Sequence, residues 1–252
     1  MLINVLIPVY NTDPMVIEEC LDSIYRQTFR DWRVFLMNDK STNEHTVDYL
    51  NSINDNKVRV FHLDKNMGGE HARLYGKNYI EDDCRYVAFM DSDDVMMPKR
   101  FEKQVKFLDS NIDVGTVGTQ MQKFYPLSIH HPQAGNINPV DCYTSHPFDV
   151  NKFILQKDWC VNNPSTMMRK EVVKNFDIDI IDRLQDEAKI PSNTFGDYIF
   201  YCINAIKGVK IRNLSDILLF YRISYPQLTQ GETYNQSNHK RLRKIIWDKY
   251  VH

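Results

Sequence analysis

Three carboxylates stand within four positions, at Asp91, Asp93 and Asp94, directly after the apolar run Tyr86–Met90. A short apolar run of this kind is typical of a buried strand, so the three side chains are expected where that strand ends. Carboxylates packed this closely repel one another, and a hard cation such as Mg²⁺ or Mn²⁺ would relieve the repulsion. Asp94 also stands shortly before Pro98, as the cap of a following helix would. These residues alone leave metal binding and helix capping open.

Strands that alternate with helices are expected on the N-terminal side of this segment. The apolar runs at residues 3–9, 33–37 and 57–62 predict buried strands, and Asp13 followed by Pro14 predicts the start of a helix. Right-handed connections between parallel strands bring their carboxyl ends to one edge of a sheet, where ligands bind. Polar residues follow each predicted strand at this edge: Tyr10 and Asn11, Asn38 and Asp39, Asn66 and Gly68, and Asp91 to Asp94.

The second half of the chain has a less regular pattern. It predicts a strand at residues 113–120, an irregular arm at 124–147, a helix at 197–206 and two short strands at 209–212 and 218–222. Residues 238–250 predict a basic amphipathic helix that docks through Leu242, Ile245 and Ile246. His130, His131 and His146 could be metal ligands, although no Cys or acidic residue stands at a matching spacing.

Composition narrows the function classes. The 252 residues include 31 Lys and Arg against 33 Asp and Glu, so no overall basic field is available for binding nucleic acid. The five cysteines are widely spread and form no Cys-x-x-Cys pair, which argues against a disulfide framework or a zinc site. No apolar stretch approaches the roughly 18–20 residues that a membrane-spanning helix needs. We therefore expect no transmembrane segment and a cytoplasmic location.

The order of four motifs resembles that of the family 2 glycosyltransferases, which are inverting enzymes of the GT-A fold. Residues 3–11 are similar to the family's opening strand, which ends in Pro-Val-Tyr-Asn, and residues 21–28 to its Leu-x-Ser helix, which ends in Gln-Thr. Residues 66–73 resemble Asn-x-Gly-x-x-x-Ala-Arg, and residues 89–94 resemble the metal-site segment. The resemblance implies an α/β fold with a Rossmann-like, mostly parallel central sheet flanked by helices, and a C-terminal arm on the acceptor side.

The resemblance also implies a division of the chain. Residues 1–222 would form the GT-A domain, with the nucleotide-sugar-binding half at 1–120 and the acceptor half at 121–222. Residues 223–252 would form a C-terminal extension that contains the basic amphipathic helix.

Roles for single residues follow from the matching motifs. Asp93 and Asp91 are implied as ligands of Mn²⁺ or Mg²⁺, and Asp197 as the general base that accepts the proton of the acceptor hydroxyl. Asp94, Asn163 and Arg222 would support these groups or face the acceptor. Contacts to the donor nucleotide are implied for Pro8, Val9, Tyr10, Asn11, Asp39, Asn66, Gly68, Arg73, Asp91 and Ser92.

Several of these residues have a plainer interpretation. Tyr10 could be a packing aromatic, Asp39 a turn-forming acid and Arg73 one half of a surface ion pair. Asp197 could simply cap the helix that it opens. The carboxylates that could replace it as the base are those of Asp182, Asp186 and Glu187.

The chain departs from the family pattern in three motifs. The family's Asp-Asp-Gly-Ser appears as Asn38-Asp39-Lys40-Ser41, which leaves Asp39 in register but keeps the identity of the nucleotide base open. Gly196 replaces the Glu that precedes the base, and Ser224 stands where many members have a histidine. These departures keep open whether the base or metal chemistry is altered.

The expected function is metal-dependent, inverting transfer of a sugar from a nucleotide-diphosphate sugar, a UDP-sugar first of all, to an acceptor hydroxyl. The acceptor could be a glycan, a lipid-linked sugar, a protein or a hydroxylated base in nucleic acid. One alternative is a non-catalytic nucleotide-sugar-binding protein of the same fold. The other is a haloacid-dehalogenase-type phosphatase, whose Asp-x-Asp motif would follow the first strand and not a fourth.

Overall fold

The computed structural model describes residues 2–124, 143–144, 146–156, 160–223 and 235–251. The strands in this part of the chain are β1 (Ile3–Val9), β2 (Trp32–Asn38), β3 (Val58–His62), β4 (Tyr86–Phe89), β5 (Val95–Met96), β6 (Val114–Phe124), β7 (Tyr143–Thr144), β8 (Met167–Arg169) and β9 (Lys210–Arg222). The helices are α1 (Pro14–Tyr25), α2 (Glu44–Ser52), α3 (Gly69–Tyr75), α4 (Arg100–Ser110), α5 (Lys170–Lys174), α6 (Asp179–Ala188), α7 (Gly196–Ile206) and α8 (Gln236–Tyr250), with short 3-10 helices η1 (Gly76–Tyr79) and η3 (Asn163–Ser165).

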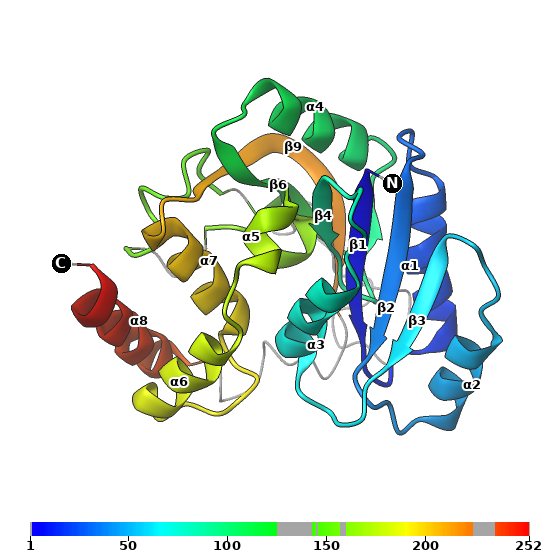
Figure 1. Ribbon diagram of the computed structural model, residues 1–252, viewed down its shortest axis with the longest axis horizontal. Helices are drawn as coiled ribbons and strands as arrows, with labels where there is room; N and C mark the ends of the chain where they lie inside the picture. The colour runs from blue at the N-terminus through cyan, green and yellow to red at the C-terminus, as the bar shows by residue number, and fades with distance from the viewer. Residues whose placement is uncertain (1, 125–142, 145, 157–159, 224–234, 252) are drawn as a thin grey trace.

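The described strands form one sheet in the order β3-β2-β1-β4-β8-β6-β9-β5, with β7 beside β6 (Figure 1). Strands β3, β2, β1 and β4 run parallel to one another, whereas β8 is antiparallel to both β4 and β6. The predicted α/β architecture is confirmed. Its parallel part is the half that carries the acidic segment, and beyond β4 the sheet is mixed.

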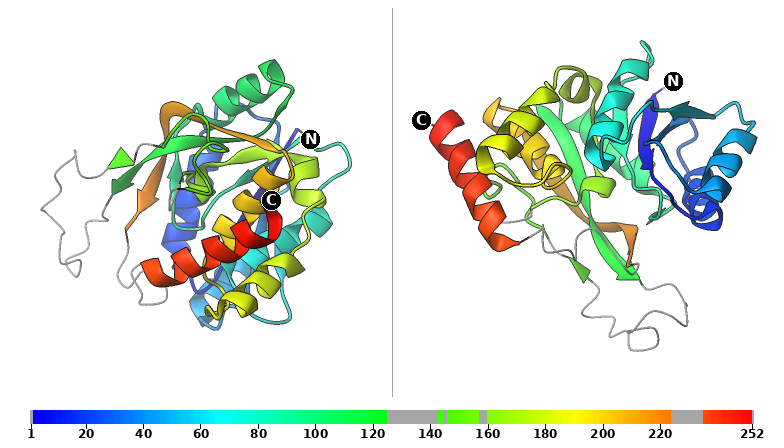
Figure 2. Two further views of the ribbon diagram at one scale, coloured as in Figure 1. Left: turned by 90° about the vertical axis from the view of Figure 1, so that its left-hand side faces the viewer. Right: turned by 90° about the horizontal axis from the view of Figure 1, so that it is seen from below.

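Helices cover both faces of this sheet, because side chains of a strand point alternately to its two faces. Val5 and Ile7 of β1 belong to a core with residues of α1, α2 and α4. Leu6, between them, belongs to the opposite core, which is built with α3, α5, α6, α7 and α8. The two helix layers appear on either side of the strands in Figures 1 and 2.

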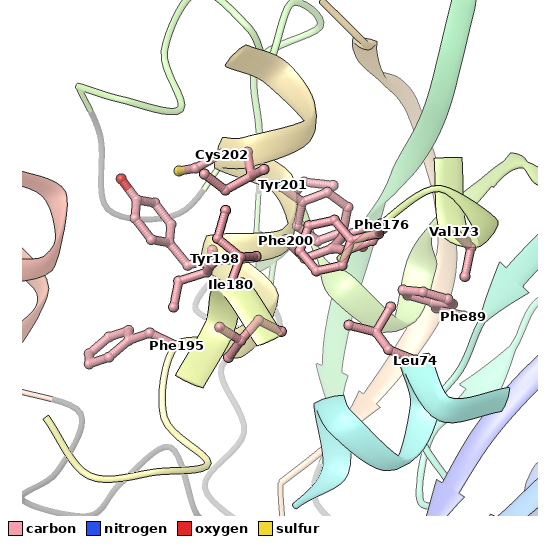
Figure 3. Close-up of a cluster of buried hydrophobic side chains, with 14 of the residues drawn as sticks. Leu74, Phe89, Val173, Phe176, Ile180, Phe195, Tyr198, Phe200, Tyr201 and Cys202 are labelled. Atoms are coloured by element: carbon pink, nitrogen blue, oxygen red, sulfur yellow. The ribbon is translucent and has the colours of Figure 1, made fainter. Parts of the chain in front are cut away.

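The core on the α7 side is rich in aromatic side chains (Figure 3). The Phe200 ring lies 5.7 Å from that of Phe89 and 4.7 Å from that of Phe176, measured between ring centroids. These contacts fix α7 against the end of β4. The predicted docking of the C-terminal helix is confirmed, because Leu242 and Ile246 of α8 are fully buried in this core.

The carboxyl ends of the parallel strands lie side by side. Val9 pairs with Asn38, which in turn pairs with His62, and Leu6 pairs with Phe89. The prediction that the polar segments after these strands share one edge is therefore confirmed. The predicted helix start is confirmed as well, since Asp13 accepts a hydrogen bond from the backbone N–H of Met15 at 2.8 Å and caps α1.

The prediction of two short strands after α7 is wrong, because β9 is continuous. Asn213 lies between the two predicted strands, but it is buried within β9 and its side chain donates to the carbonyls of Pro147 and Cys160 at 2.9 and 2.7 Å. Register shifts against β6 accommodate this stretch. Helix α6 has no counterpart among the predicted elements. Within the described residues, no helix has the length and apolar character needed to cross a membrane.

Candidate active site

The acidic segment Asp91–Asp94 connects β4 to β5 and is held by the end of β9. Asp94 is fully buried, and its Oδ1 accepts the backbone N–H of Arg222 at 2.9 Å. The Arg222 Nε donates to the Asp93 carbonyl at 2.7 Å, and its guanidinium also forms an ion pair with Glu19. The interpretation of Asp94 as a helix cap is wrong, since α4 begins only at Arg100. Asp94 and Arg222 thus fasten the acidic segment to the end of β9.

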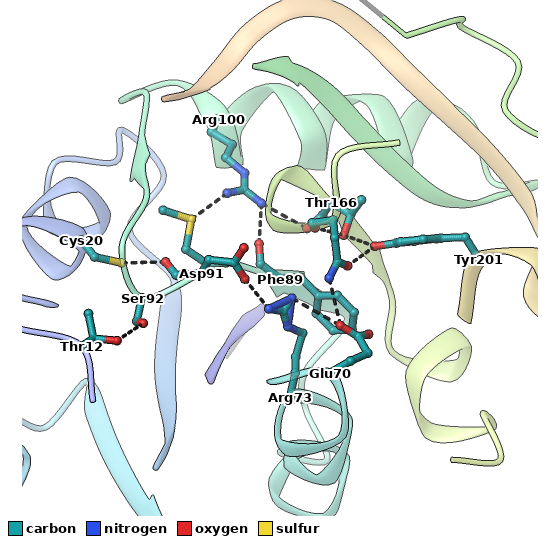
Figure 4. Close-up of polar contacts among 12 residues, drawn as sticks. Thr12, Cys20, Glu70, Arg73, Phe89, Asp91, Ser92, Arg100, Thr166 and Tyr201 are labelled. Carbon is teal, nitrogen blue, oxygen red and sulfur yellow. Dashed lines mark hydrogen bonds and ion pairs between the residues drawn. The ribbon is translucent and has the colours of Figure 1, made fainter. Parts of the chain in front are cut away.

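Arg73 lies on α3 and forms an ion pair with Asp91 (Figure 4). Its side chain is 3% exposed, so the alternative of a surface ion pair is wrong. The Arg73 guanidinium also lies 3.8 Å from the Glu70 carboxylate and 5.2 Å from the centroid of the Phe89 ring. Arg73 therefore brings a permanent positive charge to the carboxyl end of β4.

Asp39 fastens the end of β2 to the start of α3. Its two carboxylate oxygens accept the backbone N–H groups of Met67 and Gly68 at 2.7 and 2.8 Å, and the Asn66 side chain donates to the Asp39 carbonyl at 3.1 Å. Burial raises the pKa of Asp39, while these two hydrogen bonds act in the opposite direction. The predicted donor residues Asp39, Asn66 and Gly68 thus form one connected unit.

Of the two residues after β1, Tyr10 exposes its ring and the partly buried Asn11 holds the following loop. The Tyr10 side chain is about half exposed, at 49%, so the alternative of a packing aromatic does not hold. Asn11 has a positive φ of 54°, and its side-chain oxygen accepts the backbone N–H groups of Thr42 and Asn43 at 2.7 and 2.9 Å. Pro8 and Val9 pair with the end of β2, and the Ser92 hydroxyl lies 2.8 Å from that of Thr12.

Asp197 lies in the first turn of α7, directly after Gly196. The residue at the cap position is Phe195, so the interpretation of Asp197 as a helix cap is wrong. The Asp197 Oδ1 accepts the backbone N–H of Tyr198 at 2.8 Å. Burial and, next, the negative charge of Glu70 raise the pKa of Asp197 to about 7. A carboxylate with such a pKa can both accept and hold a proton near neutral pH.

The carboxylates considered as replacements for Asp197 lie on α6. Asp182 has an exposed side chain whose Oδ1 is 3.0 Å from the His71 Nε2. Glu187 forms an ion pair with Lys249 of α8 at 2.7 Å, and Asp186 is exposed on the same helix.

A buried polar network joins the acidic segment to α7, and sequence reasoning missed most of it (Figure 4). Asn163 donates to the Glu70 carboxylate at 2.9 Å and accepts from the Tyr201 hydroxyl at 2.8 Å. Beyond Tyr201, Thr166 lies within hydrogen-bonding distance at 2.9 Å, and the Thr166 carbonyl accepts from the buried Arg100 at 3.2 Å. Tyr201 could have been found, because it stands four residues after Asp197 and therefore on the same helix face.

Asp91 and Asp93 are the residues that could hold a divalent cation. Burial, followed by the charge of Asp91, raises the pKa of Asp93 to about 6. Within the described ranges, no group of three or more His, Cys, Asp and Glu side chains is arranged to hold a metal. Two carboxylates nevertheless fit Mg²⁺ or Mn²⁺, because such ions take further oxygen ligands from water and substrate phosphates.

The histidines of the predicted arm give no support to a separate metal site. The His146 Nε2 lies 2.9 Å from the Asn162 side-chain oxygen, and burial lowers the pKa of His146. His130, His131 and Ser224 lie outside the described residues.

Residues 4–176, more than half of the chain, match the family described as Glycosyl transferase family 2. The chain belongs to this family. An uncharacterized glycosyltransferase of Methanocaldococcus jannaschii is 24% identical over 88% of the chain and 71% of its own length. The O-antigen biosynthesis glycosyltransferase WbnJ of Escherichia coli is 27% identical over 88% of the chain and 80% of its own length.

Other family 2 relatives are much longer than the matched region. The chain covers 29% of the bifunctional glycosyltransferase pgtA of Dictyostelium discoideum and 38% of the glycosyltransferase GlyG of Streptococcus pneumoniae. Among solved structures, S. aureus TarS in complex with UDP-GlcNAc is similar with a TM-score of 0.67 at 17% identity, over all of this chain and 68% of that one. The fold is therefore that of the GT-A glycosyltransferases, and the phosphatase alternative is excluded by family membership.

Proposed function

We propose that this family 2 glycosyltransferase moves a sugar from a nucleoside-diphosphate sugar, a UDP-sugar first of all, to an acceptor hydroxyl with inversion at the anomeric carbon. The observation that carries the proposal is the Arg73–Asp91 ion pair at the end of β4, whose charges act on both Asp93 and Asp197. Two structural neighbours support a nucleotide-sugar donor: TarS was solved with UDP-GlcNAc, and a mannosyltransferase of Pyrobaculum calidifontis, with a TM-score of 0.56, was solved with GDP-Man and Mn²⁺.

The nucleoside would lie beside the ends of β1 and β2. The exposed ring of Tyr10 offers a stacking surface for the base, and Pro8 and Val9 border it. Each Asp39 oxygen accepts one backbone N–H and retains a second lone pair, which can accept a base N–H. Asn11 and Asn66 keep these loops in place through their hydrogen bonds.

The diphosphate would lie at the end of β4, near Ser92 and the Arg73–Asp91 pair. Asp93 and Asp91 would hold Mn²⁺ or Mg²⁺, which when bound acts as a Lewis acid toward the departing diphosphate. Arg73 adds a charge that does not depend on pH in the physiological range. Asp94 and Arg222 hold the acidic segment so that its carboxylates keep their positions.

Asp197 would act as the general base on the acceptor side. Its carboxylate accepts the proton of the acceptor hydroxyl while the hydroxyl oxygen forms its bond to the anomeric carbon. The bond from that carbon to the diphosphate oxygen breaks on the opposite face, and the nucleoside diphosphate leaves with the electron pair. Attack opposite to the leaving group accounts for inversion.

The broader organisation is part of the proposal. Residues 1–120 would bind the donor, residues 121–222 would form the acceptor half, and residues 223–252 would extend it through α8. Among the described residues, Cys20, Cys84 and Cys202 carry free, buried thiols, which supports a reducing, cytoplasmic location.

A donor panel tests the proposed function. The full chain is incubated with Mn²⁺ and UDP-, GDP-, dTDP- or CMP-sugars, and release of the free nucleotide is measured. We expect slow hydrolysis of a UDP-sugar without acceptor. Binding of a nucleotide sugar with no turnover, even with a range of hydroxyl acceptors, would instead indicate a non-catalytic protein of this fold.

A further inference from the structure

Glu70, in the first turn of α3, is a buried acid that the proposed reaction does not use. Its side chain is 11% exposed. One carboxylate oxygen accepts from Asn163, whereas the other, Oε1, is buried without a hydrogen-bond partner in the described part of the chain. Burying a carboxylate with an unsatisfied oxygen is unfavourable unless a nearby charge or a function compensates for it. The place of Glu70 in the site therefore needs an explanation.

Glu70 connects three elements that border the proposed substrates. On its own helix, it lies 3.8 Å from the guanidinium of Arg73, which pairs with Asp91. Through Asn163 of η3 it reaches the Tyr201 hydroxyl of α7. Figure 4 shows Glu70 beside Arg73, in the network of contacts that leads on to Tyr201. One carboxylate thus links the donor side of the site to the helix that carries Asp197.

Gly196 provides the space for this arrangement. A Cβ atom on Gly196 would lie 3.1 Å from the Cβ and 3.2 Å from the Cγ of Glu70, so a larger residue would push the Glu70 side chain away. Gly196 has no positive φ, and the backbone therefore does not require glycine there. The close approach of Glu70 to the start of α7 is what glycine permits. The two positions are matched in size across the helix contact.

We propose that Glu70 is a positioning residue for sugar transfer, which stands in the space left by Gly196, holds Arg73 and Asn163 in place, and presents its negative charge to the start of α7, where Asp197 lies. This inference rests on the proposed role of Asp197 as the general base. A negative charge beside a carboxylate favours its protonated form and so increases its basicity. Glu70 is the largest charged contributor to the raised pKa of Asp197, and the other titratable groups around Asp197 are Arg73, Asp91, Tyr201 and Cys202.

The substitution Glu70→Gln tests this role because it removes the charge and keeps the shape and the acceptor for Asn163. We expect the acid limb of the kcat/KM profile to move to lower pH by about half to one unit. We also expect kcat at pH 8 to fall about 3- to 10-fold, because a weaker base assists less. The donor KM should change little. Glu44→Gln, an exposed acid in the first turn of α2, is the matched control and should leave both profile and rate unchanged.

A variant that moves the carboxylate to another residue distinguishes an effect of its charge from a purely structural effect. In the double variant Glu70→Ser with Gly196→Glu, the acid enters the same space from α7, and we expect the wild-type acid limb to return in part. An unmoved pH profile in Glu70→Gln, whatever the donor KM, would overturn the proposal. The variant Asp197→Asn separates the two levels: if it transfers normally, the base assignment fails, whereas loss of transfer there and an unmoved profile in Glu70→Gln reject Glu70 alone.

Discussion

The backbone N–H of Arg222 donates to the buried Asp94 carboxylate at 2.9 Å, although the two residues are 128 positions apart in the sequence. This bond joins the last turn of the acidic segment to the end of β9. The pKa of Asp94 is raised by burial and by the charges of Asp93 and Asp91. The segment that would hold the metal therefore depends on a strand from the other end of the chain.

Replacement of Asp94 separates its hydrogen bond from its charge. Asp94→Asn keeps an oxygen for the Arg222 N–H, and we expect its free energy of unfolding to stay within about 1 kcal/mol of the wild type. Asp94→Leu leaves that buried N–H unpaired, which should lower the free energy of unfolding by about 1–3 kcal/mol. Urea denaturation measures both values. Equal stability of the Asn and Leu variants would show that the bond to Arg222 contributes nothing.

The two adjacent glycines before and at the start of α3 should differ in their tolerance of a side chain. Gly68 has φ +86°, and a Cβ there would overlap the Asn193 side chain, whereas a Cβ on Gly69 would meet nothing within 4 Å. We expect Gly68→Ala to reduce the free energy of unfolding by more than about 1 kcal/mol, and Gly69→Ala to be neutral or stabilising. Thermal melts of the two variants compare them directly. A similar loss of stability in both variants would show that the positive φ and the contact with Asn193 do not restrict Gly68.

Removal of the Asp197 carboxylate should stabilise the fold in neutral and basic solution. The pKa rises from 3.8 to about 7 on folding, so the fold disfavours the charged form, by at most about 4 kcal/mol at about 1.4 kcal/mol per pKa unit. The folded state is therefore most favoured below pH 3.8, where Asp197 is protonated in both states, and its free energy of unfolding falls as the pH rises to about 7. The free energy of unfolding of Asp197→Asn should therefore increase relative to that of the wild type between these two pH values, and the variant should remain the more stable protein above pH 7. Denaturation at pH 5 and pH 8 measures the gap, and a gap that shrinks toward pH 8 would be the wrong sign.

The rate of transfer should rise with pH through about 7. The base must be unprotonated to accept the proton of the acceptor, and the pKa of Asp197 sets the fraction that is ready. A kcat/KM profile between pH 5 and pH 9 should show one proton lost along its acid limb. A flat profile across this range would remove Asp197 as the rate-determining base.

The positions of the proposed donor residues in the fold could largely be predicted from the sequence, because these residues follow strands in short motifs. The strand runs place Tyr10, Asp39 and Asp91 at one edge whatever the details of packing. The sequence could not show that the Asp39 carboxylate accepts hydrogen bonds from Met67 and Gly68, since these contacts depend on how α3 approaches β2.

The acceptor side was harder to predict because its contacts join distant segments. Glu70, Asn163 and Tyr201 meet only after α3, η3 and α7 have packed. The division of β9 into two predicted strands was wrong for the same reason, since the Asn213 side chain donates inside the fold to carbonyls more than 50 residues away. Propensity alone cannot distinguish such a residue from one in a surface turn.

The most direct test of the central claim is nucleotide release by Asp93→Asn, measured with the donor that the wild-type chain turns over in the presence of Mn²⁺. Asp22→Asn, an exposed acid on α1, serves as the matched control. We expect Asp93→Asn to lose at least about 100-fold in rate, because metal stabilisation of a leaving diphosphate is worth several kcal/mol. EDTA should reduce the wild type to the same level. Turnover that persists in both EDTA and Asp93→Asn would contradict a metal-assisted transfer at this site.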